Sequence, residues 1–292
     1  MMSQQNHIYP DFIGVGAMRC GTTWIADMLR AHPDIYIPAH FKELHFFDRH
    51  FEKGQAWYFE NFADKGADQI AGEFTPAYMR SKQAMEQLAA TCPDAKLIIS
   101  LRHPAERAYS HYTFLKNRKS ISSSFYDALF DERFEILKAG LFGEQLEQCL
   151  SLFSRENVHV IIFDEIRSNP EGVLKSLYGF LGVAPDFIPQ QTSEKVNARH
   201  RVRFKFLAQI IQQLKHFLRS SIRGRQGLVR VGFFKLGRII NRLNSTSIDR
   251  EPIDEQARAY LRQYYEKDLL KLNSHLSGKV QSWLTPDKGQ VS

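Results

Sequence analysis

The sequence predicts an α/β protein with a P-loop-type parallel sheet flanked by helices. A short apolar segment at residues 11–16 leads into a glycine-containing turn, and a helical apolar pattern follows at 22–31 before Pro33. Further apolar segments alternate with helical patterns along the chain. With 292 residues, 43% of them hydrophobic, the chain can bury a core of this kind. Because strands alternate with helices, we expect a mostly parallel sheet with helices on both faces.

The remaining elements of the predicted sheet follow in chain order. Strands are predicted at 96–101 and 157–163, with a weaker one at 69–74. Helices are predicted at 104–116, where Pro104 suits the first turn, and at 170–181, which Asn169 and Pro170 open. No internal repeat or low-complexity linker interrupts the pattern, so we expect a single domain over residues 1–292.

The basic residues are concentrated in one segment. Thirteen Lys and Arg and no Asp or Glu occur between Lys195 and Ile248, so this segment carries +13 and the remaining chain −6 of the net +7. Apolar and basic patterns at 204–219 and 228–243 predict that residues 195–248 form a mostly helical segment or flap in the C-terminal third. Packing of these helices on the core is favoured, and peripheral membrane contact is the alternative.

Cysteine usage and hydropathy limit the class of protein. The three cysteines form no CxxC pair, which argues against a disulfide framework and a zinc site, and we expect no metal ion. The N-terminal residues do not resemble a targeting segment, and no stretch of about 18 apolar residues occurs. We therefore expect a soluble cytoplasmic protein.

Residues 14–23, GVGAMRCGTT, have the frame of a phosphate-binding loop. A glycine turn between a strand and a helix presents backbone N–H groups at the positive end of the helix dipole, where they can hold a tetrahedral oxyanion. Thr22 stands where a nucleotide triphosphatase carries lysine, and Arg19 is the only cation of the loop. The alternative is a tight strand-to-helix turn without a ligand.

A second candidate anion site follows the strand at 96–101. Arg102 comes directly after it, and Ser110 lies eight residues further on in the predicted helix. Ligands of open α/β sheets bind at the carboxyl ends of the strands. Two anion sites on strand-to-helix turns would suit a nucleotide that carries phosphates at both ends. The alternative is that Arg102 is an exposed arginine and Ser110 a helix-surface serine, and that neither binds a ligand.

Four motifs in order, GAMRCGTTW, KELHFFD, GEFTPAY and LRHPAERAYSHY, lie between Gly16 and Tyr112. Together they resemble the sulfotransferases that use 3′-phosphoadenosine 5′-phosphosulfate (PAPS), particularly the group of heparan sulfate 3-O-sulfotransferases and their bacterial relatives. The later NVHVIIFDEIRSNP and LRQYYEKDLLKLNSHL fit more loosely. The resemblance implies a transferase that moves a sulfuryl group from PAPS to an acceptor and releases adenosine 3′,5′-bisphosphate (PAP).

The resemblance also assigns the cofactor-binding residues. The 5′-phosphosulfate would be held by the glycine loop, with Trp24 opening the helix, and the loop residues concerned are Arg19, Cys20, Gly21, Thr22 and Thr23. The 3′-phosphate would be held by Arg102 and Ser110. A late loop usually covers the adenine and the 3′-phosphate. The stretch NARHRVR is placed to supply it through Asn197, Arg199, Arg201 and Arg203, with the choice among the arginines open.

The stretch FKELHFFD, residues 41–48, contains the catalytic candidates. In an extended segment Glu43 and His45 would point to the same side, which sets a carboxylate beside an imidazole. A polar pair with a purely structural role in a loop is the alternative. The resemblance implies that Glu43 is the general base, that His45 and Asp48 orient it, and that Arg19 stabilises the leaving bisphosphate. Lys42 either reaches the sulfonate or is solvated.

The acceptor side is less defined. Trp57 and Tyr78 are candidates to line it together with Lys42 and Asp48, and core packing is the alternative for the aromatic residues. Phe74 replaces the lysine that the heparan enzymes carry at this position, which favours a smaller or less anionic acceptor. We expect a small-molecule or saccharide acceptor with a hydroxyl, amine or guanidine group, and no nucleic acid. Nothing in the sequence selects an oligomeric state.

Two other classes of function compete with sulfuryl transfer. A P-loop kinase or NTPase is opposed by Thr22 and would need Asp164 as its magnesium ligand. A basic protein that binds nucleic acid or membranes would explain residues 195–248, but it would leave Glu43 and Arg102 without a role.

Overall fold

The computed structural model describes residues 9–39, 43–189, 192, 200–202, 245–247 and 253–285. The chain divides into two compact units, one of residues 1–194 with 253–292 and one of residues 195–252. A five-stranded sheet with its helices makes up the described part of the first unit. The described part of the second unit is an antiparallel strand pair, β6 (His200–Val202) with β7 (Ser245–Ser247).

The sheet of the first unit is parallel throughout, in the order β2-β3-β1-β4-β5. Its strands are β1 (Phe12–Gly16), β2 (Ile35–Tyr36), β3 (Ile70–Phe74), β4 (Lys96–Leu101) and β5 (Val158–Ile162). Its α-helices are α1 (Thr22–Ala31), α2 (Phe46–Arg49), α3 (Gly54–Glu60), α4 (Lys82–Thr91), α5 (Pro104–Asn117), α6 (Phe125–Leu129), α7 (Phe142–Leu152), α8 (Phe163–Ser168), α9 (Pro170–Leu181) and α12 (Glu255–His275). Short 3-10 helices cover Phe51–Lys53, Tyr78–Arg80, Glu132–Phe134, Lys138–Gly140, Arg155–Asn157 and Gln281–Trp283.

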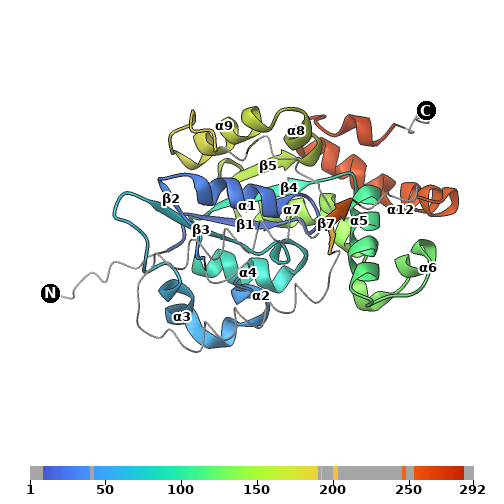
Figure 1. Cartoon of the computed structure of the whole chain (residues 1–292), viewed down its shortest axis with the longest axis horizontal. Coiled ribbons are helices and arrows are strands. Elements are labelled where there is room, and N and C mark those ends of the chain that lie inside the picture. The colour runs from blue at the N-terminus through green and yellow to red at the C-terminus, as the bar shows by residue number, and fades with distance from the viewer. Residues whose placement is uncertain are drawn as a thin grey trace. The chain divides into compact units, whose positions relative to one another are not determined.

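Apolar runs form the central strands because both faces of this sheet are covered. All five residues of β1 are buried, as expected for a strand enclosed on both sides. Ile13 and Val15 belong to a core cluster that also contains side chains of α4, α5, α7 and α12. On the other face α9 meets α1, and the Tyr178 hydroxyl donates to the Met28 carbonyl at 3.3 Å. Figure 1 shows the helices on both sides of the sheet.

The helix α12 is tied to α7 by a carboxylate from far along the chain. Asp268 accepts hydrogen bonds from the backbone N–H groups of Gly143 and Glu144, each at 2.9 Å. A carboxylate at this place satisfies two of the N–H groups that a helix leaves unpaired in its first turn. Residues 253–285 therefore complete the same unit as the sheet.

The structure confirms the predicted α/β class and the parallel sheet. The strands expected at 11–16, 69–74, 96–101 and 157–163 correspond to β1, β3, β4 and β5. The amphipathic helices expected at 204–219 and 228–243 lie outside the described residues. Within the basic segment 195–248, the six described residues form the strands β6 and β7. The single domain over 1–292 stays a prediction.

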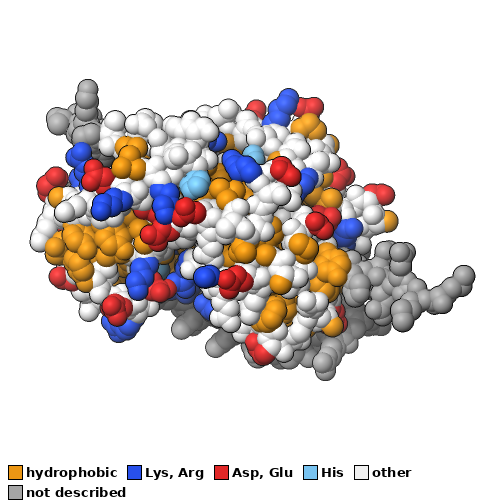
Figure 2. Space-filling view, turned by 180° about the vertical axis from the view of Figure 1, so that it is seen from behind, with side chains coloured by type: hydrophobic (Ala, Val, Ile, Leu, Met, Phe, Trp, Pro, Cys, Tyr) orange, Lys and Arg blue, Asp and Glu red, His pale blue; other side chains and the backbone are white. Residues whose placement is uncertain are grey.

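The described surface carries mixed charge. Figure 2 shows Lys and Arg side chains interspersed with Asp and Glu over one face of the described residues. The excess of basic residues belongs to the segment 195–248. Among the described helices, none combines the length and apolar character that crossing a membrane requires.

The close approach of β1 and β3 generates a stability prediction. Gly14 pairs with Phe74, and a Cβ at Gly14 would overlap the Phe74 ring. We expect Gly14→Ala to lower the free energy of unfolding by about 1–3 kcal/mol, as overpacking of cores does. Urea unfolding followed by circular dichroism measures this. Gly179→Ala is the control, because Gly179 is exposed on α9 with open space around it, and it should be neutral or stabilising by up to about 1 kcal/mol. Equal stabilities of Gly14→Ala and wild type would contradict the close approach.

Candidate active site

The turn after β1 exposes the N-terminus of α1. Gly21 is the N-cap residue, with φ of 87°, and no side chain caps the helix. Arg19 also has a left-handed backbone, with φ of 70°, a conformation that is uncommon for a residue other than glycine. A Cβ at Gly21 would come within 2.9 Å of the Phe163 ring, so the space and the conformation both favour glycine there. The first N–H groups of α1 thus have no side-chain cap, and anion binding by this loop stays a prediction.

The side chains of the loop divide into outward and inward sets. Thr23 is exposed, whereas Cys20, Thr22 and Trp24 are buried. Burial raises the pKa of the Cys20 thiol to about 12. Cys20 can therefore meet a ligand only through its backbone N–H. The buried Trp24 Nε1 has no hydrogen-bond partner among the described residues.

The two predicted anion sites meet. Arg19 Nε lies 3.4 Å from Ser110 Oγ, a contact that joins the glycine loop to α5. Arg102 directly follows β4, and its side chain is 7% exposed and bonded to Glu106 at 2.7 Å. Its guanidinium lies 5.0 Å from the centre of the Phe163 ring, next to the glycine turn. Arg19, Arg102 and Ser110 thus gather at the carboxyl ends of β1 and β4.

Two further arginines belong to this cluster of positive charge, and the sequence analysis missed them. Arg107 is fully buried on α5, and Arg118 lies 4.4 Å from the Phe114 ring, whose centre is 4.6 Å from the Arg19 guanidinium. Burial lowers the pKa of Arg19, and Arg102, Arg107 and Arg118 lower it further by repulsion. Arginine stays protonated in proteins, so the cluster is a site of positive potential that an anion would neutralise.

The catalytic candidates form a connected group. His45 Nε2 lies 3.1 Å from Glu43 Oε2, and His45 Nδ1 lies 3.0 Å from Asp48 Oδ2. Hydrogen bonds to Asp48 and Glu43 raise the pKa of His45 to about 9, so the imidazole is protonated at neutral pH. The predicted pairing of Glu43 with His45 is confirmed, but not through an extended backbone. His45 is left-handed, with φ of 52°, at the start of α2.

A buried carboxylate supports this group, and sequence analysis missed it. Glu73, at the end of β3, is 2% exposed, and burial raises its pKa to about 7 while hydrogen bonds from Thr75, Tyr78 and Tyr58 oppose that rise. Thr75 Oγ1 accepts from the N–H groups of Leu44 and His45. Glu73, Thr75 and Tyr78 all lie in the motif GEFTPAY. This motif is distant along the chain from residues 43–48, so the sequence did not indicate that the two stretches are in contact.

Thr75 also places the Glu43 segment relative to the glycine loop. Its backbone N–H donates to the Gly14 carbonyl at 3.0 Å, two residues before the end of β1. The segment 43–48 therefore lies at the same edge of the sheet as the loop.

The acceptor-side candidates have different surroundings. Trp57 is partly exposed, with Lys53 Nζ 4.3 Å from its ring centre. Tyr78 is fully buried, and its hydroxyl bonds Glu73 and the Phe46 N–H. Phe74 packs against Phe12 on the opposite side of β3 from Glu73. Lys42 and Arg203 lie outside the described residues, and Arg201 is described only as part of β6.

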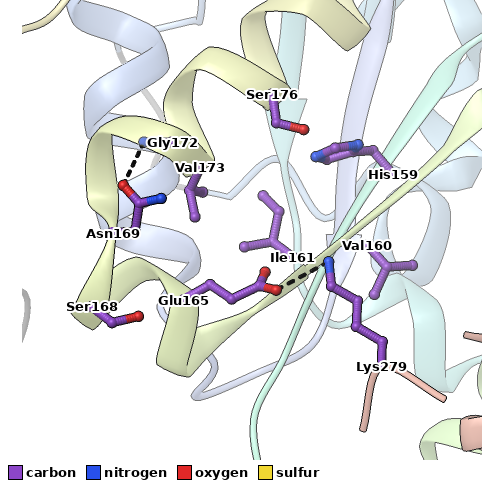
Figure 3. A pocket seen from close by; sticks show the side chains of 10 residues that line it. All are labelled: His159, Val160, Ile161, Glu165, Ser168, Asn169, Gly172, Val173, Ser176 and Lys279. Carbon is purple, nitrogen blue, oxygen red and sulfur yellow. Dashed lines mark hydrogen bonds and ion pairs between the residues drawn. The ribbon is translucent and has the colours of Figure 1, made fainter.

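A cavity of about 300 Å³ lies beside β5 (Figure 3). Glu165 of α8 and Lys279 face each other across it in an ion pair of 3.2 Å. Its lining residues are His159, Val160, Ile161, Glu165, Ser168, Asn169, Gly172, Val173, Ser176 and Lys279. None of the predicted site residues is among them, so this cavity is separate from the candidate active site.

This chain is an α/β protein whose parallel sheet has a glycine loop, an arginine cluster and a carboxylate–imidazole pair at its carboxyl edge. The chain belongs to the sulfotransferase domain family, whose profile matches residues 9–222. This confirms the family that the four motifs indicated.

Sequence relatives agree with this family, and a solved structure shares the fold. The mouse heparan sulfate glucosamine 3-O-sulfotransferase 3B1 is 32% identical over 182 residues, which are 60% of this chain and 46% of the mouse protein. A bifunctional heparan sulfate N-deacetylase/N-sulfotransferase 1 from Caenorhabditis briggsae is 31% identical over 208 residues, 64% of this chain and 24% of that protein. The chain thus spans less than half of the length of these relatives. A crystal structure of a sulfotransferase from Alicyclobacillus acidocaldarius shares the fold, with a TM-score of 0.69 at 24% identity over 95% of this chain and 99% of that one.

The raised pKa of His45 leads to a pH-dependent prediction. Because its folded-state pKa of about 9 exceeds the ordinary 6.5, the stabilisation from its charged pairs is full below about pH 6.5 and is lost as the pH rises through about 9. Asp48→Asn removes the largest cause of the shift. We expect this variant to have a lower His45 pKa by NMR titration, and to be less stable than wild type by a margin that is larger at about pH 6 than at about pH 10. A margin that does not vary with pH would contradict the ion pair.

Proposed function

We propose that this chain transfers a sulfuryl group from PAPS to an oxygen or nitrogen of an acceptor and releases PAP. The observation that carries the proposal is the contact of 3.4 Å between Arg19 and Ser110, which joins the glycine loop to the Arg102 turn at one edge of the sheet. Membership of the sulfotransferase domain family supports the same reaction.

The residues at this edge fit such a donor. PAPS carries phosphates on the 3′ and 5′ oxygens of its ribose, and the 5′-phosphate bears the transferable sulfuryl group. The uncapped N-terminus of α1 with Arg19 suits the phosphosulfate end, and Arg102 with Ser110 suits the 3′-phosphate. Burial lowers the pKa of Arg19 most and the neighbouring arginines lower it further, and a bound polyanion would offset their repulsion.

The protonation state of His45 favours Glu43 as the general base. An imidazolium has no lone pair with which to take a proton, and the pKa of His45 of about 9 keeps it in this form at neutral pH. Glu43, 31% exposed, would take the proton of the acceptor group as that group attacks sulfur and the bond from sulfur to the phosphate oxygen breaks. His45, held by Asp48, would orient the Glu43 carboxylate. Arg19 and the loop N–H groups would stabilise the charge on the departing phosphate.

The acceptor is proposed to be a small molecule or a saccharide that is less anionic than heparan sulfate. The relatives are named for heparan sulfate, which supports a saccharide. The position where the heparan enzymes carry lysine is Phe74 here, and its ring is buried against Phe12 and Gly14 instead of facing an anion. An acceptor screen therefore starts with neutral saccharides, small alcohols and amines.

Substitution of Glu43 tests the catalytic assignment. General-base catalysis contributes about 10²- to 10⁴-fold, so we expect Glu43→Gln to lower turnover by that factor with the affinity for PAP nearly unchanged. Transfer of ³⁵S from labelled PAPS to an acceptor found in the screen measures turnover. Glu86→Gln, on the exposed surface of α4, is the control and should retain wild-type turnover. Wild-type turnover in Glu43→Gln would remove Glu43 from the mechanism.

Calorimetric titration with PAP, beside ATP with magnesium, tests the class of donor. We expect PAP to bind and Arg102→Ala to weaken it by about 10-fold or more, because a charge-assisted hydrogen bond to phosphate contributes about 1.5–3 kcal/mol. Arg30→Ala is the control, since Arg30 lies at the end of α1 remote from the glycine loop and pairs with Asp27. Binding of ATP alone would instead support a P-loop kinase or NTPase.

A further inference from the structure

We propose that Glu73 is a positioning residue whose buried carboxylate, acting through the hydroxyls of Thr75 and Tyr78, holds the backbone that carries Glu43 and His45. This inference rests on the proposed function, since it assigns Glu73 a part in placing the general base. It adds a residue of β3 to the machinery, although Glu73 itself does not touch the reacting atoms.

The contacts form one continuous chain. Glu73 Oε2 accepts from the Thr75 hydroxyl at 2.7 Å, and Glu73 Oε1 accepts from the Tyr78 hydroxyl at 2.9 Å. The Thr75 oxygen accepts from the N–H groups of Leu44 and His45 at 3.1 and 3.2 Å. The Tyr78 oxygen accepts from the Phe46 N–H at 2.8 Å. Three consecutive N–H groups are thus held by two hydroxyls, and both hydroxyls are oriented by one carboxylate.

Counting donors and acceptors explains why a carboxylate is needed. A hydroxyl has one proton to donate and lone pairs with which to accept. Because Glu73 takes both hydroxyl protons, the lone pairs of Thr75 and Tyr78 are directed to the N–H groups. The ionised carboxylate, which predominates above the Glu73 pKa of about 7, only accepts, so it can serve both hydroxyls at once. A glutamine could accept from one of them but would present an NH₂ group to the other.

The backbone that this network holds is one that needs support. His45 has φ of 52°, a left-handed conformation that costs about 1–2 kcal/mol for a residue other than glycine. This conformation places His45 within hydrogen-bond distance of both Glu43 and Asp48. Removal of the hydrogen bonds to the N–H groups of residues 44–46 would let the segment relax and would separate the imidazole from its carboxylates.

The network is distinct from ordinary core packing. Glu73 is 2% exposed, and a buried charged group persists only where hydrogen bonds compensate its lost hydration. A leucine or methionine would fill the same volume at lower electrostatic cost, yet the chain has a carboxylate here. Besides Glu73 and each other, these two hydroxyls bond N–H groups of the catalytic segment.

Thr75→Val and Thr75→Ser form the test, with Glu73→Gln as a second variant. Valine keeps the shape of threonine but has no hydroxyl, and serine keeps the hydroxyl. We expect Thr75→Val and Glu73→Gln to lower kcat about 10- to 100-fold, as small displacements of catalytic groups do, with the Kd for PAP within about twofold of wild type. Thr75→Ser should stay close to wild type in both quantities.

NMR titration of the His45 Cε1 proton gives a readout that does not depend on activity. In wild type we expect a midpoint at about 9, and in Thr75→Val a midpoint displaced toward the ordinary 6.5, because the imidazole no longer meets both carboxylates. Ser81→Ala is the matched control. It removes a hydroxyl that caps α4 at 3.2 Å, so it should lower stability comparably while leaving kcat and the His45 midpoint unchanged.

The outcomes distinguish the positioning role of Glu73 from the role of Glu43 as general base. An unchanged His45 midpoint in both Thr75→Val and Glu73→Gln would overturn the positioning role, as would equal damage from Thr75→Ser and Thr75→Val. A displaced midpoint together with wild-type turnover in Glu43→Gln would uphold the positioning of the segment and reject Glu43 as the base.

Discussion

Parallel hydrogen bonding of β3, β1 and β4 places the carboxyl ends of three neighbouring strands at one edge of the sheet, and the candidate active site depends on this arrangement. Each strand contributes a different component. The glycine loop follows β1, Arg102 follows β4, and Glu73 with Thr75 ends β3. No other described element has to bring these groups together, because the pairing register already does so. The loops therefore need only local adjustments, such as the left-handed residues at 19, 21 and 45.

Charge is separated across the central strand. On the β4 side lie the arginines, with Arg107 fully buried, and on the β3 side lie the carboxylates of Glu43, Asp48 and Glu73 around His45. A reaction that leaves negative charge on a phosphate and a proton on a base needs these two environments close together but distinct. The strand order separates Arg102, which follows β4 on one side of β1, from Glu73, which lies in β3 on the other side. Because of this separation, the arginines lie near one another and the carboxylates lie around His45, although both sets belong to one site.

Much of this arrangement was predictable, for identifiable physical reasons. The apolar runs of β1, β4 and β5 predicted the sheet because strands buried on both faces are continuously hydrophobic. The loop and Arg102 were predictable because they directly follow such strands. Glu73, Arg107 and Phe114 were not, because their roles arise from contacts between elements distant in sequence. Hydrophobic periodicity did not predict β2, because a strand of two residues is too short to show a pattern. It also could not predict the left-handed backbone of His45.

The cap that Asp268 supplies to α7 has a consequence for how the protein acquires its fold during synthesis. The N–H groups of Gly143 and Glu144 bond the carboxylate of Asp268, which lies 125 and 124 residues further along the chain. The whole unit of residues 195–252 leaves the ribosome before that partner does. All five strands of the sheet lie between Ile162 and the N-terminus and are made before α12, but α7 cannot obtain its cap until α12 has been made. The side of the core that Leu261, Tyr265 and Leu269 of α12 cover therefore cannot be closed until residues 255–275 have been made.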